Sequence, residues 1–369
     1  MRKKKILVVF GTRPEAIKMA PLVKELEGRD NFETVVVVTG QHKQMLNQVL
    51  DTFGISPKYD LAIMKANQSL SDITCAVLEK TREIFVVENP EIVLVHGDTT
   101  TAFASALAAF YLRIKIGHVE SGLRTYDLDA PYPEEFNRQA VDIVSDYMFA
   151  PTELSKNNLE KEGKDPRKIF VTGNTVIDSM KMTVRTDYKH DVLNWVGKDR
   201  LILLTAHRRE NLGRPLENIF SAVKRIVTEY SDVKVVYPVH LNPLVKDVAD
   251  KVLKNEKNVK LIEPLDVVDF HNFINQSYLI LTDSGGIQEE APSLGKPVLV
   301  ARDTTERPEG IQAGTLKLVG TNANNVYNQI KLLLDSPEEY SKMSKAVNPY
   351  GDGLASKRIA DILSKEDGT

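Results

Sequence analysis

The sequence predicts an α/β protein with two doubly wound parallel sheets. Short apolar runs alternate with stretches of helical pattern along the chain, and each run is continuously apolar. Continuous runs of this length are typical of strands in a parallel sheet that helices cover on both faces. The length of 369 residues exceeds one typical hydrophobic core, so we expect the pattern to be used twice.

The expected strands fall into two sets. The first set lies in residues 5–11, 34–40, 91–98 and 114–120, and the second in residues 201–207, 233–240, 259–265, 278–286 and 297–302, with one more strand expected between the sets at 169–174. A polar, irregular stretch places the domain change between residues 172 and 200. We therefore expect an N-terminal Rossmann-like domain at 1–172 and a C-terminal one at 173–353. The last helix, 354–369, is expected to pack back on the first domain.

The composition favours a cytoplasmic protein that acts on a small molecule. The 48 Lys and Arg residues against 51 Asp and Glu residues give a net charge of -3, which offers no basic footprint for nucleic acid or an anionic membrane. A single cysteine, Cys75, excludes an internal disulfide framework and suits a reducing compartment. The apolar run near the start is too short for a signal peptide, and no stretch approaches the roughly 20 apolar residues of a spanning helix.

Polar residues follow the expected strands of the first domain, at the end where open parallel sheets bind ligands. After the first strand, Gly11 and Pro14 suit a strand-to-helix turn, whereas Arg13 is left to face the crevice as an anion-binding residue. In "GDTTTAFASALAAFY", Asp98 precedes three threonines. One helix does not need four residues that can cap it, so Asp98 is a candidate site residue as well as a candidate cap.

The stretch "TDSGGIQEEAPSLGKPV", residues 282–298, predicts a nucleotide diphosphate site. Ser284, Gly285 and Gly286 follow a strand, and their bare backbone amides can open a helix toward a phosphate. Glu290, one helical turn later, can accept hydrogen bonds from ribose hydroxyls. The chain lacks both the GxxxxGK[ST] of a P-loop and the GxGxxG of a tightly held nicotinamide.

Two histidines, His207 and His240, follow strands of the second domain and are expected to face the same crevice. The other histidines are expected to be structural: His42, His96, His118, His190 and His271. The chain has no HExxH motif and no Cys/His cluster, so we expect no metal. The "DLD" at 127–129 matches a metal-binding pattern but is interpreted as loop carboxylates.

Nine segments of the chain together resemble a known family. They are "FGTRPEAIKMAPL", "VHGDTTTAFA", "GHVESGLRT", "PYPEEFNRQ", "TGNTVID", "TAHRREN", "YPVHLNP", "TDSGGIQEEAPSLGKPVLV" and "RDTTERPEG". The resemblance is to the bacterial non-hydrolysing UDP-N-acetylglucosamine 2-epimerase. It implies two Rossmann-like domains facing a central cleft, as in GT-B glycosyltransferases, a homodimer, and an isomerase without a cofactor. The implied reaction converts UDP-GlcNAc reversibly to UDP-ManNAc for cell-wall polysaccharides such as teichoic acid linkage units.

The implied chemistry accounts for the residue types. The C2 proton of this sugar has no adjacent carbonyl, so its direct abstraction and return would be very slow. Loss of UDP from C1 together with the C2 proton gives 2-acetamidoglucal, and return of both with the opposite C2 configuration gives the epimer. This route needs a base, an acid and cations around the diphosphate, but no redox cofactor.

Carried over by motif position, the essential acids of the family fall on Asp98, Glu120 and Glu134, and its essential histidine falls on His207. Glu120 and Glu134 are interpreted as proton carriers, and Glu135 as a cap or scaffold residue. The implied UDP contacts are Arg13, Lys18, His240, Leu265, Phe270, Ser284, Gly285, Gly286, Glu290 and Arg307.

Some members bind a second UDP-GlcNAc as an allosteric activator. The matching residues here are Gln41, Gln44, Gln68 and Arg208, together with Glu134 and His207. Asn67 stands where one such member has arginine, and the loss of that cation weakens a contact to phosphate. Ser121 and Ala130 stand where alanine and serine are common in the family, and both flank the catalytic loop.

Three alternatives stay open from the sequence. A GT-B glycosyltransferase would share the SGG and Glu290 nucleotide site but would not require the acids of the first domain. A hydrolysing epimerase would release free ManNAc and UDP. A UDP-sugar sensor would bind its ligand without turnover, and the dense set of acids argues against it.

Overall fold

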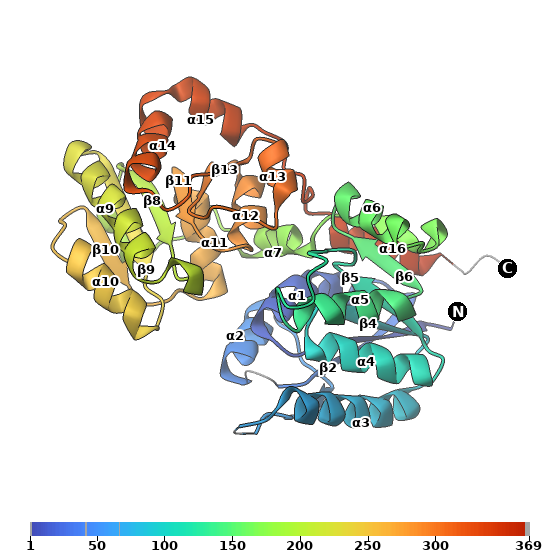
Figure 1. The fold of residues 1–369 in the computed structure, drawn as a ribbon. Helices are drawn as coiled ribbons and strands as arrows, with labels where there is room; N and C mark the ends of the chain where they lie inside the picture. The colour runs from blue at the N-terminus through green and yellow to red at the C-terminus, as the bar shows by residue number, and fades with distance from the viewer. Residues whose placement is uncertain (1, 41–42, 66, 366–369) are drawn as a thin grey trace. The chain divides into compact units, whose positions relative to one another are not determined.

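The computed structural model describes residues 2–40, 43–65 and 67–365, which fold as two compact α/β units (Figure 1). Unit 1 comprises Met1–Met182 and Tyr350–Thr369, and unit 2 comprises Thr183–Pro349. Each unit has its own parallel sheet and its own buried apolar core. The prediction of two doubly wound parallel sheets is therefore confirmed.

Unit 1 holds a sheet of seven parallel strands in the order β3-β2-β1-β4-β5-β6-β7. The strands are β1 (Lys4–Phe10), β2 (Phe32–Val38), β3 (Tyr59–Asp60), β4 (Ile92–His96), β5 (Lys115–Val119), β6 (Tyr147–Ala150) and β7 (Ile169–Val171). The helices are α1 (Arg13–Glu27), α2 (Lys43–Phe53), α3 (Leu70–Glu88), α4 (Thr100–Tyr111), α5 (Glu134–Val144), α6 (Glu153–Lys161), η1 (Pro166–Lys168), α7 (Thr175–Thr183) and α16 (Ala355–Ser364). Helices α3, α4 and α5 pack side by side, and α1 packs against α2 and α16.

Unit 2 holds a sheet of six parallel strands in the order β10-β9-β8-β11-β12-β13. The strands are β8 (Arg200–Thr205), β9 (Val233–Pro238), β10 (Val259–Ile262), β11 (Leu279–Thr282), β12 (Val298–Val300) and β13 (Leu316–Leu318). The helices are α8 (Asp191–Val196), η2 (Arg209–Asn211), α9 (Arg214–Glu229), α10 (Pro243–Leu253), α11 (Val267–Gln276), α12 (Ile287–Glu290), η3 (Ala291–Leu294), α13 (Pro308–Gln312), α14 (Ala323–Asp335) and α15 (Pro337–Ser344). Across the described part of both units, every helix is too short or too polar to cross a bilayer.

Both sheets reverse their strand order at one point. In unit 1 the reversal lies between β1 and β4, where Val8 pairs with Leu94. In unit 2 it lies between β8 and β11, where Leu203 pairs with Ile280. Open parallel sheets bind ligands beyond the carboxyl ends of the two strands at such a point. The topology therefore selects one edge of each sheet for function.

Unit 1 ends at Met182, ten residues after the expected end of the first domain at 172. This boundary lies within residues 172–200, where the domain change was expected. Helix α7 remains with unit 1 through Asp178, a buried residue whose carboxylate accepts hydrogen bonds from the backbone of Ala355 and Ser356 at 3.2 and 2.8 Å. These bonds satisfy two amides at the start of α16 that have no partner within the helix.

The C-terminal helix α16 lies among the elements of unit 1, where Figure 1 draws it in red. Its buried stripe includes Ile359 and Leu363. On its polar side, Arg29, two residues after the end of α1, pairs with Asp361 at 2.7 Å. Lys4 of β1 donates a hydrogen bond to the carbonyl of Leu363 at 2.9 Å. The last turns of the chain are thus part of the first core.

Candidate active site

The two reversal points of strand order carry the predicted polar residues. In unit 1, Arg13 begins α1 directly after β1, and Asp98 follows the neighbouring strand β4. In unit 2, His207 follows β8, and Ser284 follows the neighbouring strand β11. Because the strands are parallel, each pair of residues shares one edge of its sheet. The rule that selected these residues in the sequence therefore places them at the same edge within each unit.

Glu120 follows β5 and is a buried carboxylate in unit 1. It pairs with the Lys18 ammonium, lies 3.3 Å from His96 Nε2, and accepts a hydrogen bond from Asn174 Nδ2 at 3.0 Å. Burial raises the pKa of Glu120, but the charges of Lys18 and His96 outweigh burial and hold the pKa well below its usual range. Glu120 is therefore ionised at neutral pH.

The backbone of Glu120 adopts the left-handed region, with φ at 68°. This conformation costs a residue other than glycine about 1 kcal/mol, and such strain is concentrated at functional sites. Because the backbone turns here, the carboxylate leaves the end of β5 toward α1 instead of continuing the strand. Lys18 on α1 then meets it.

Asp98 is held by α5. Arg138 donates to the Asp98 carboxylate at 2.5 Å, and the Asn137 side chain donates to the Asp98 carbonyl at 2.9 Å. Arg138 also pairs with Glu135 at 3.3 Å. The candidate acid after β4 is thereby tied to the helix that begins at Glu134.

The neighbouring acids Glu134 and Glu135 differ in their surroundings. Glu135 is fully buried and accepts hydrogen bonds from the backbone amides of Thr125 and Tyr126, each at 3.0 Å. It holds the loop between β5 and α5, as expected for a scaffold residue. Glu134 is half-buried at the first position of α5, and within the described residues its carboxylate has no hydrogen-bond or ion-pair partner.

A buried ionic cluster supports the loops that carry these acids. His118 lies between the Asp142 carboxylate, 2.6 Å from Nδ1, and the Gly97 carbonyl, 2.8 Å from Nε2. Asp142 also accepts hydrogen bonds from Ser121 at 2.5 Å and from Arg124 at 2.7 Å. Gly97 precedes Asp98 and Ser121 follows Glu120, so one carboxylate anchors both loops.

The charge of Asp142 is maintained by its partners. Burial raises the pKa of Asp142, whereas His118, Arg124 and the Ser121 hydroxyl lower it by more, so that the pKa lies at about 2. Asp142 therefore stays ionised in the interior, where an unpaired carboxylate would be costly.

In unit 2, the buried Asp283 organises the turn after β8. One of its oxygens, Oδ2, accepts hydrogen bonds from the backbone amides of His207 and Arg208 at 2.8 Å each, and from Asn211 Nδ2 at 3.0 Å. His207 is stacked on His240 with ring centroids 4.9 Å apart and planes 3° from parallel. The two histidines that were expected to face the same crevice are therefore in contact.

The pKa of His207 lies below its usual value. Burial is the largest cause, the charge of Asp283 opposes it, and the neighbours His240 and Arg208 lower the pKa further. A neutral imidazole at pH 7 can accept a proton or donate one hydrogen bond, as proton transfer requires.

The predicted diphosphate turn is compact. Helix α12 has only one turn, and η3 follows it directly. A Cβ at Gly285 would lie 3.1 Å from a carboxylate oxygen of Glu306, which pairs with Arg208 at 2.9 Å. At Gly286, a Cβ would lie 3.5 Å from a carboxylate oxygen of Glu290. The absence of a side chain at Gly285 leaves room for the Glu306 carboxylate, whereas the distance at Gly286 is an ordinary van der Waals contact.

The remaining predicted contacts of unit 2 lie on adjoining elements. Arg307, at the start of α13, pairs with the buried Glu289 of α12. Glu290 lies 4.0 Å from His271 on α11, the helix that also carries Phe270. Leu265 lies in the loop between β10 and α11.

A family model described as UDP-N-acetylglucosamine 2-epimerase matches residues 24–364. The chain belongs to the UDP-N-acetylglucosamine 2-epimerase family. The UDP-N-acetylglucosamine 2-epimerase of Bacillus subtilis is 60% identical, with 98% of this chain and 96% of that protein covered. Family membership assigns an epimerase activity on UDP-N-acetylglucosamine to the chain.

Solved structures of the family share this GT-B-like fold. The structure of the S. aureus protein MnaA with UDP has a TM-score of 0.90 and 55% identity, and covers 98% of this chain and 96% of that chain. The Neisseria meningitidis UDP-GlcNAc 2-epimerase, solved with UDP-GlcNAc, has a TM-score of 0.88 and 48% identity, and covers 98% of this chain and all of that chain. Members of the epimerase family thus bind UDP and UDP-GlcNAc with this fold.

Some of the activator residues implied by the family resemblance lie within the described residues, and one does not. Gln41 lies outside the described residues, and Gln44 lies in α2. The Gln68 side chain bonds the amide of Lys65 at 2.6 Å and the carbonyl of Ile63 at 2.9 Å. The activator site stays a prediction.

Several residues around the acids were not selected from the sequence. His96 was expected to be structural, yet it lies beside Glu120, and Asn174 and Arg138 were not singled out. Among the residues that were not selected, Glu15 is the one that its sequence neighbours could have indicated. The motif "TRPE" matches the capping box that Thr12 and Glu15 form at the start of α1. The others meet the acids through contacts between distant segments.

We predict that Asp142→Asn lowers the free energy of unfolding by about 3 to 5 kcal/mol, because it leaves Arg124 without its buried counter-charge and His118 without its carboxylate partner. Urea unfolding at pH 7 measures this change. An Asp51→Asn control on exposed α2 should change it by less than about 0.5 kcal/mol.

The low pKa of Asp142 also predicts how the stability of the wild type changes in acid. The folded pKa of Asp142, at about 2, lies below the ordinary 3.8, so its stabilisation is present above about pH 4 and is lost as pH falls toward 2. The wild type should lose about 2 kcal/mol from this group over that window. An Asp142→Asn variant with unchanged stability at pH 7 would contradict the assignment.

Proposed function

We propose that the chain epimerises UDP-GlcNAc at C2 by elimination and re-addition of UDP, without releasing free sugar. The observation that carries the proposal is Glu120, a buried carboxylate held ionised at a strand end by Lys18 and His96. In this proposal the acids of unit 1 carry the proton transfers, and the residues of unit 2 that are expected to contact the nucleotide bind UDP. The UDP-ManNAc formed in the cytoplasm would then supply cell-surface polysaccharide synthesis.

The proposed reaction is balanced without an oxidant. A carboxylate takes the C2 proton, the C2–H electron pair forms the C1=C2 bond, and the C1–O pair leaves with UDP. Return of a proton to the other face of C2 and of UDP to C1 gives UDP-ManNAc. The barrier is lowered by proton carriers at C2 and by donors to the departing diphosphate.

Lys18 links binding to proton transfer in this proposal. While Lys18 pairs with Glu120, the carboxylate is a weak base because its pKa is low. Lys18 is also an expected diphosphate contact. A diphosphate that drew the ammonium away would remove the main charge that lowers the Glu120 pKa, and burial would then raise it. Substrate binding would thereby strengthen the base.

Glu134 is proposed as the second proton carrier. Its carboxylate is half-buried and has no partner within the described residues, so it can meet a substrate without first breaking an ion pair. Asp98, held by Arg138, is proposed to orient the sugar. His207, neutral at pH 7, is proposed to donate to the diphosphate or to relay a proton.

The turn after β11 in unit 2 is proposed to bind UDP. Ser284, Gly285 and Gly286 form a tight turn after β11, with Glu290 folded back toward it. This arrangement supports diphosphate and ribose contacts, and Arg13 and Arg307 supply cations. The relatives solved with UDP and UDP-GlcNAc support the choice of nucleotide.

The decisive experiment incubates the purified protein with UDP-GlcNAc alone in heavy water and follows C2 by NMR. We expect UDP-ManNAc with deuterium at C2. Free ManNAc would instead indicate a hydrolysing epimerase. No reaction without an acceptor would favour a glycosyltransferase or a sensor, and epimerised product that retains hydrogen at C2 would contradict exchange with solvent.

We predict that Glu134→Gln lowers kcat by about 100-fold or more while UDP affinity changes by less than about threefold. The substitution removes the ionisable group and nearly preserves the shape of the side chain. Steady-state kinetics and calorimetric titration with UDP measure the two effects. Glu153→Gln, an exposed residue of α6, is the control, and full activity of Glu134→Gln would refute the proton-carrier role.

We also propose that the chain is a homodimer through the outer face of α3, α4 and α5. This face exposes large apolar side chains near the C-terminal end of each helix: Val87, Tyr111 and Ile143, with exposed fractions of 75, 65 and 71%. Because the three helices are neighbours, these side chains form one surface rather than scattered positions. Such a surface is typical of a contact between copies.

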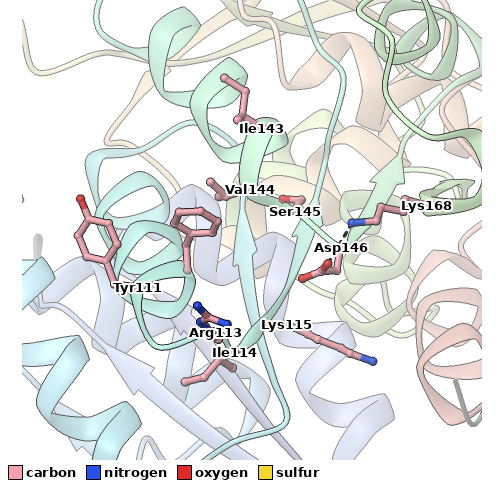
Figure 2. A pocket seen from close by; sticks show the side chains of 10 residues that line it. Tyr111, Arg113, Ile114, Lys115, Ile143, Val144, Ser145, Asp146 and Lys168 are labelled. Atoms are coloured by element: carbon pink, nitrogen blue, oxygen red, sulfur yellow. Dashed lines mark hydrogen bonds and ion pairs between the residues drawn. The ribbon is translucent and has the colours of Figure 1, made fainter.

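A hollow of about 690 Å³ adjoins this face (Figure 2). Tyr111 and Ile143 line it, together with Lys115 and an Asp146–Lys168 ion pair of 3.0 Å. The hollow lies at the amino ends of β5 and β6, whereas the candidate catalytic residues follow carboxyl ends. We therefore assign it to the proposed dimer surface and not to catalysis.

Replacing Ile143 by Glu should convert the dimer to a monomer, because it places a charge on the apolar face. Size-exclusion chromatography with light scattering measures the mass. The control is Val347→Glu, which puts the same charge on an exposed apolar position of unit 2. A wild type that is monomeric at micromolar concentration, or a variant that stays dimeric, would refute this surface.

A further inference from the structure

We propose that Asp283 is a positioning residue that fixes the tautomer of His207, so that His207 presents Nε2 to its substrate. The inference rests on the proposed function, in which His207 meets the substrate. Asp283 has one carboxylate oxygen, Oδ1, near the His207 ring. This residue is fully buried, and Oδ1 has no hydrogen-bond partner among the described residues, although Oδ2 accepts three hydrogen bonds.

The free oxygen lies toward the His207 ring. Asp283 Oδ1 is 3.8 Å from His207 Nδ1, which is about 1 Å longer than a charge-assisted hydrogen bond. Hydrogen bonds at catalytic groups are often long without substrate and shorten in the complex. A buried acceptor without a donor is unfavourable, so a small rotation of the ring toward Asp283 would be stabilising.

The backbone contacts make this geometry rigid. The same carboxylate accepts the amide of His207 itself through Oδ2, so the aspartate and the histidine main chain are held together. Asn211 and the Arg208 amide fix the remaining freedom of the carboxylate plane. Oδ1 is therefore held 3.8 Å from Nδ1 of the His207 ring.

The chemistry then selects one tautomer. An ionised carboxylate can only accept, so Nδ1 of His207 must carry the proton and Nε2 keeps its lone pair. Of the two roles proposed for His207, this tautomer favours the proton relay, because the neutral ring then has no N–H at Nε2 to donate to the diphosphate. His240, stacked on the other side, accepts the Asn242 amide at its Nδ1, 3.1 Å away, and so does not compete for Asp283. Arg208 and His240 disfavour a positive charge on the His207 ring, whereas the Asp283 carboxylate stabilises a positive charge that forms there during turnover.

The test begins with the unaltered protein, whose 7 histidines are labelled with ¹⁵N in the ring. Long-range ¹H–¹⁵N NMR reports which nitrogen of each neutral ring carries the proton, and the His207→Gln spectrum identifies the His207 signals. We expect the proton of His207 on Nδ1, both free and with UDP bound. A proton on Nε2 would overturn the proposal without any variant of Asp283.

Asp283→Asn is the matched variant, because its carbonyl can still accept the three hydrogen bonds while its NH₂ replaces Oδ1. The amide would donate to His207 Nδ1 and move the ring proton to Nε2. We expect kcat to fall by about 100-fold or more, with UDP affinity changed by less than about threefold. Unchanged tautomer and kcat would overturn the proposal.

Asn211→Ala separates this effect from disruption of the turn. It removes a donor to Oδ2 and should lower Tm, but it should leave the His207 tautomer unaltered. A tautomer change in Asn211→Ala equal to that in Asp283→Asn would reduce Asp283 to a structural role. If heavy-water NMR showed no epimerisation while the tautomer followed Asp283, the proposed function would fail and the Asp283–His207 pair would stand.

Discussion

The structure depends on one constraint, the burial of both faces of an all-parallel sheet. Each strand of such a sheet must be apolar along its length, because helices cover it above and below. Polar chemistry is thereby confined to the strand ends. Since all strands of a unit run the same way, residues distant in sequence meet at one edge, and the reversal of strand order keeps the helices from covering that edge. Arg13, Asp98 and Glu120 in one unit and His207 and Ser284 in the other are placed by this rule alone.

Within unit 1, similar acids receive different tasks from their surroundings. Glu135 accepts hydrogen bonds from backbone amides, Asp142 from His118, Ser121 and Arg124, and Glu120 pairs with an ammonium that a phosphate could attract. Glu134 has no such partner in the described part of the unit. The same functional group thus serves as support or as reagent according to how strongly the protein already binds it.

The sequence predicted the fold and most strand ends because hydrophobic period and strand-to-helix turns are local properties. Gly11 and Pro14, or Ser284 to Gly286, are recognisable from their neighbours alone. The pairing of Lys18 with Glu120 and of His118 with Asp142 was not predictable in this way, because each joins segments whose distance depends on sheet order and register. The exact position of the domain boundary within residues 172–200 was not predictable for the same reason, since Asp178 binds amides far along the chain. The family resemblance supplied roles for individual residues that pattern alone left open.

The return of α16 to unit 1 bears on how the chain matures during synthesis. Unit 2 lies wholly within residues 183–349, so it is translated in full before the segment that completes unit 1 emerges. The first-made part of the protein is therefore the last to be finished, contrary to the usual N-terminal-first order of domain folding. Until Ile359 and Leu363 arrive, the nascent unit 1 must leave their apolar contact surface on α1 and its neighbours open to water or to a chaperone.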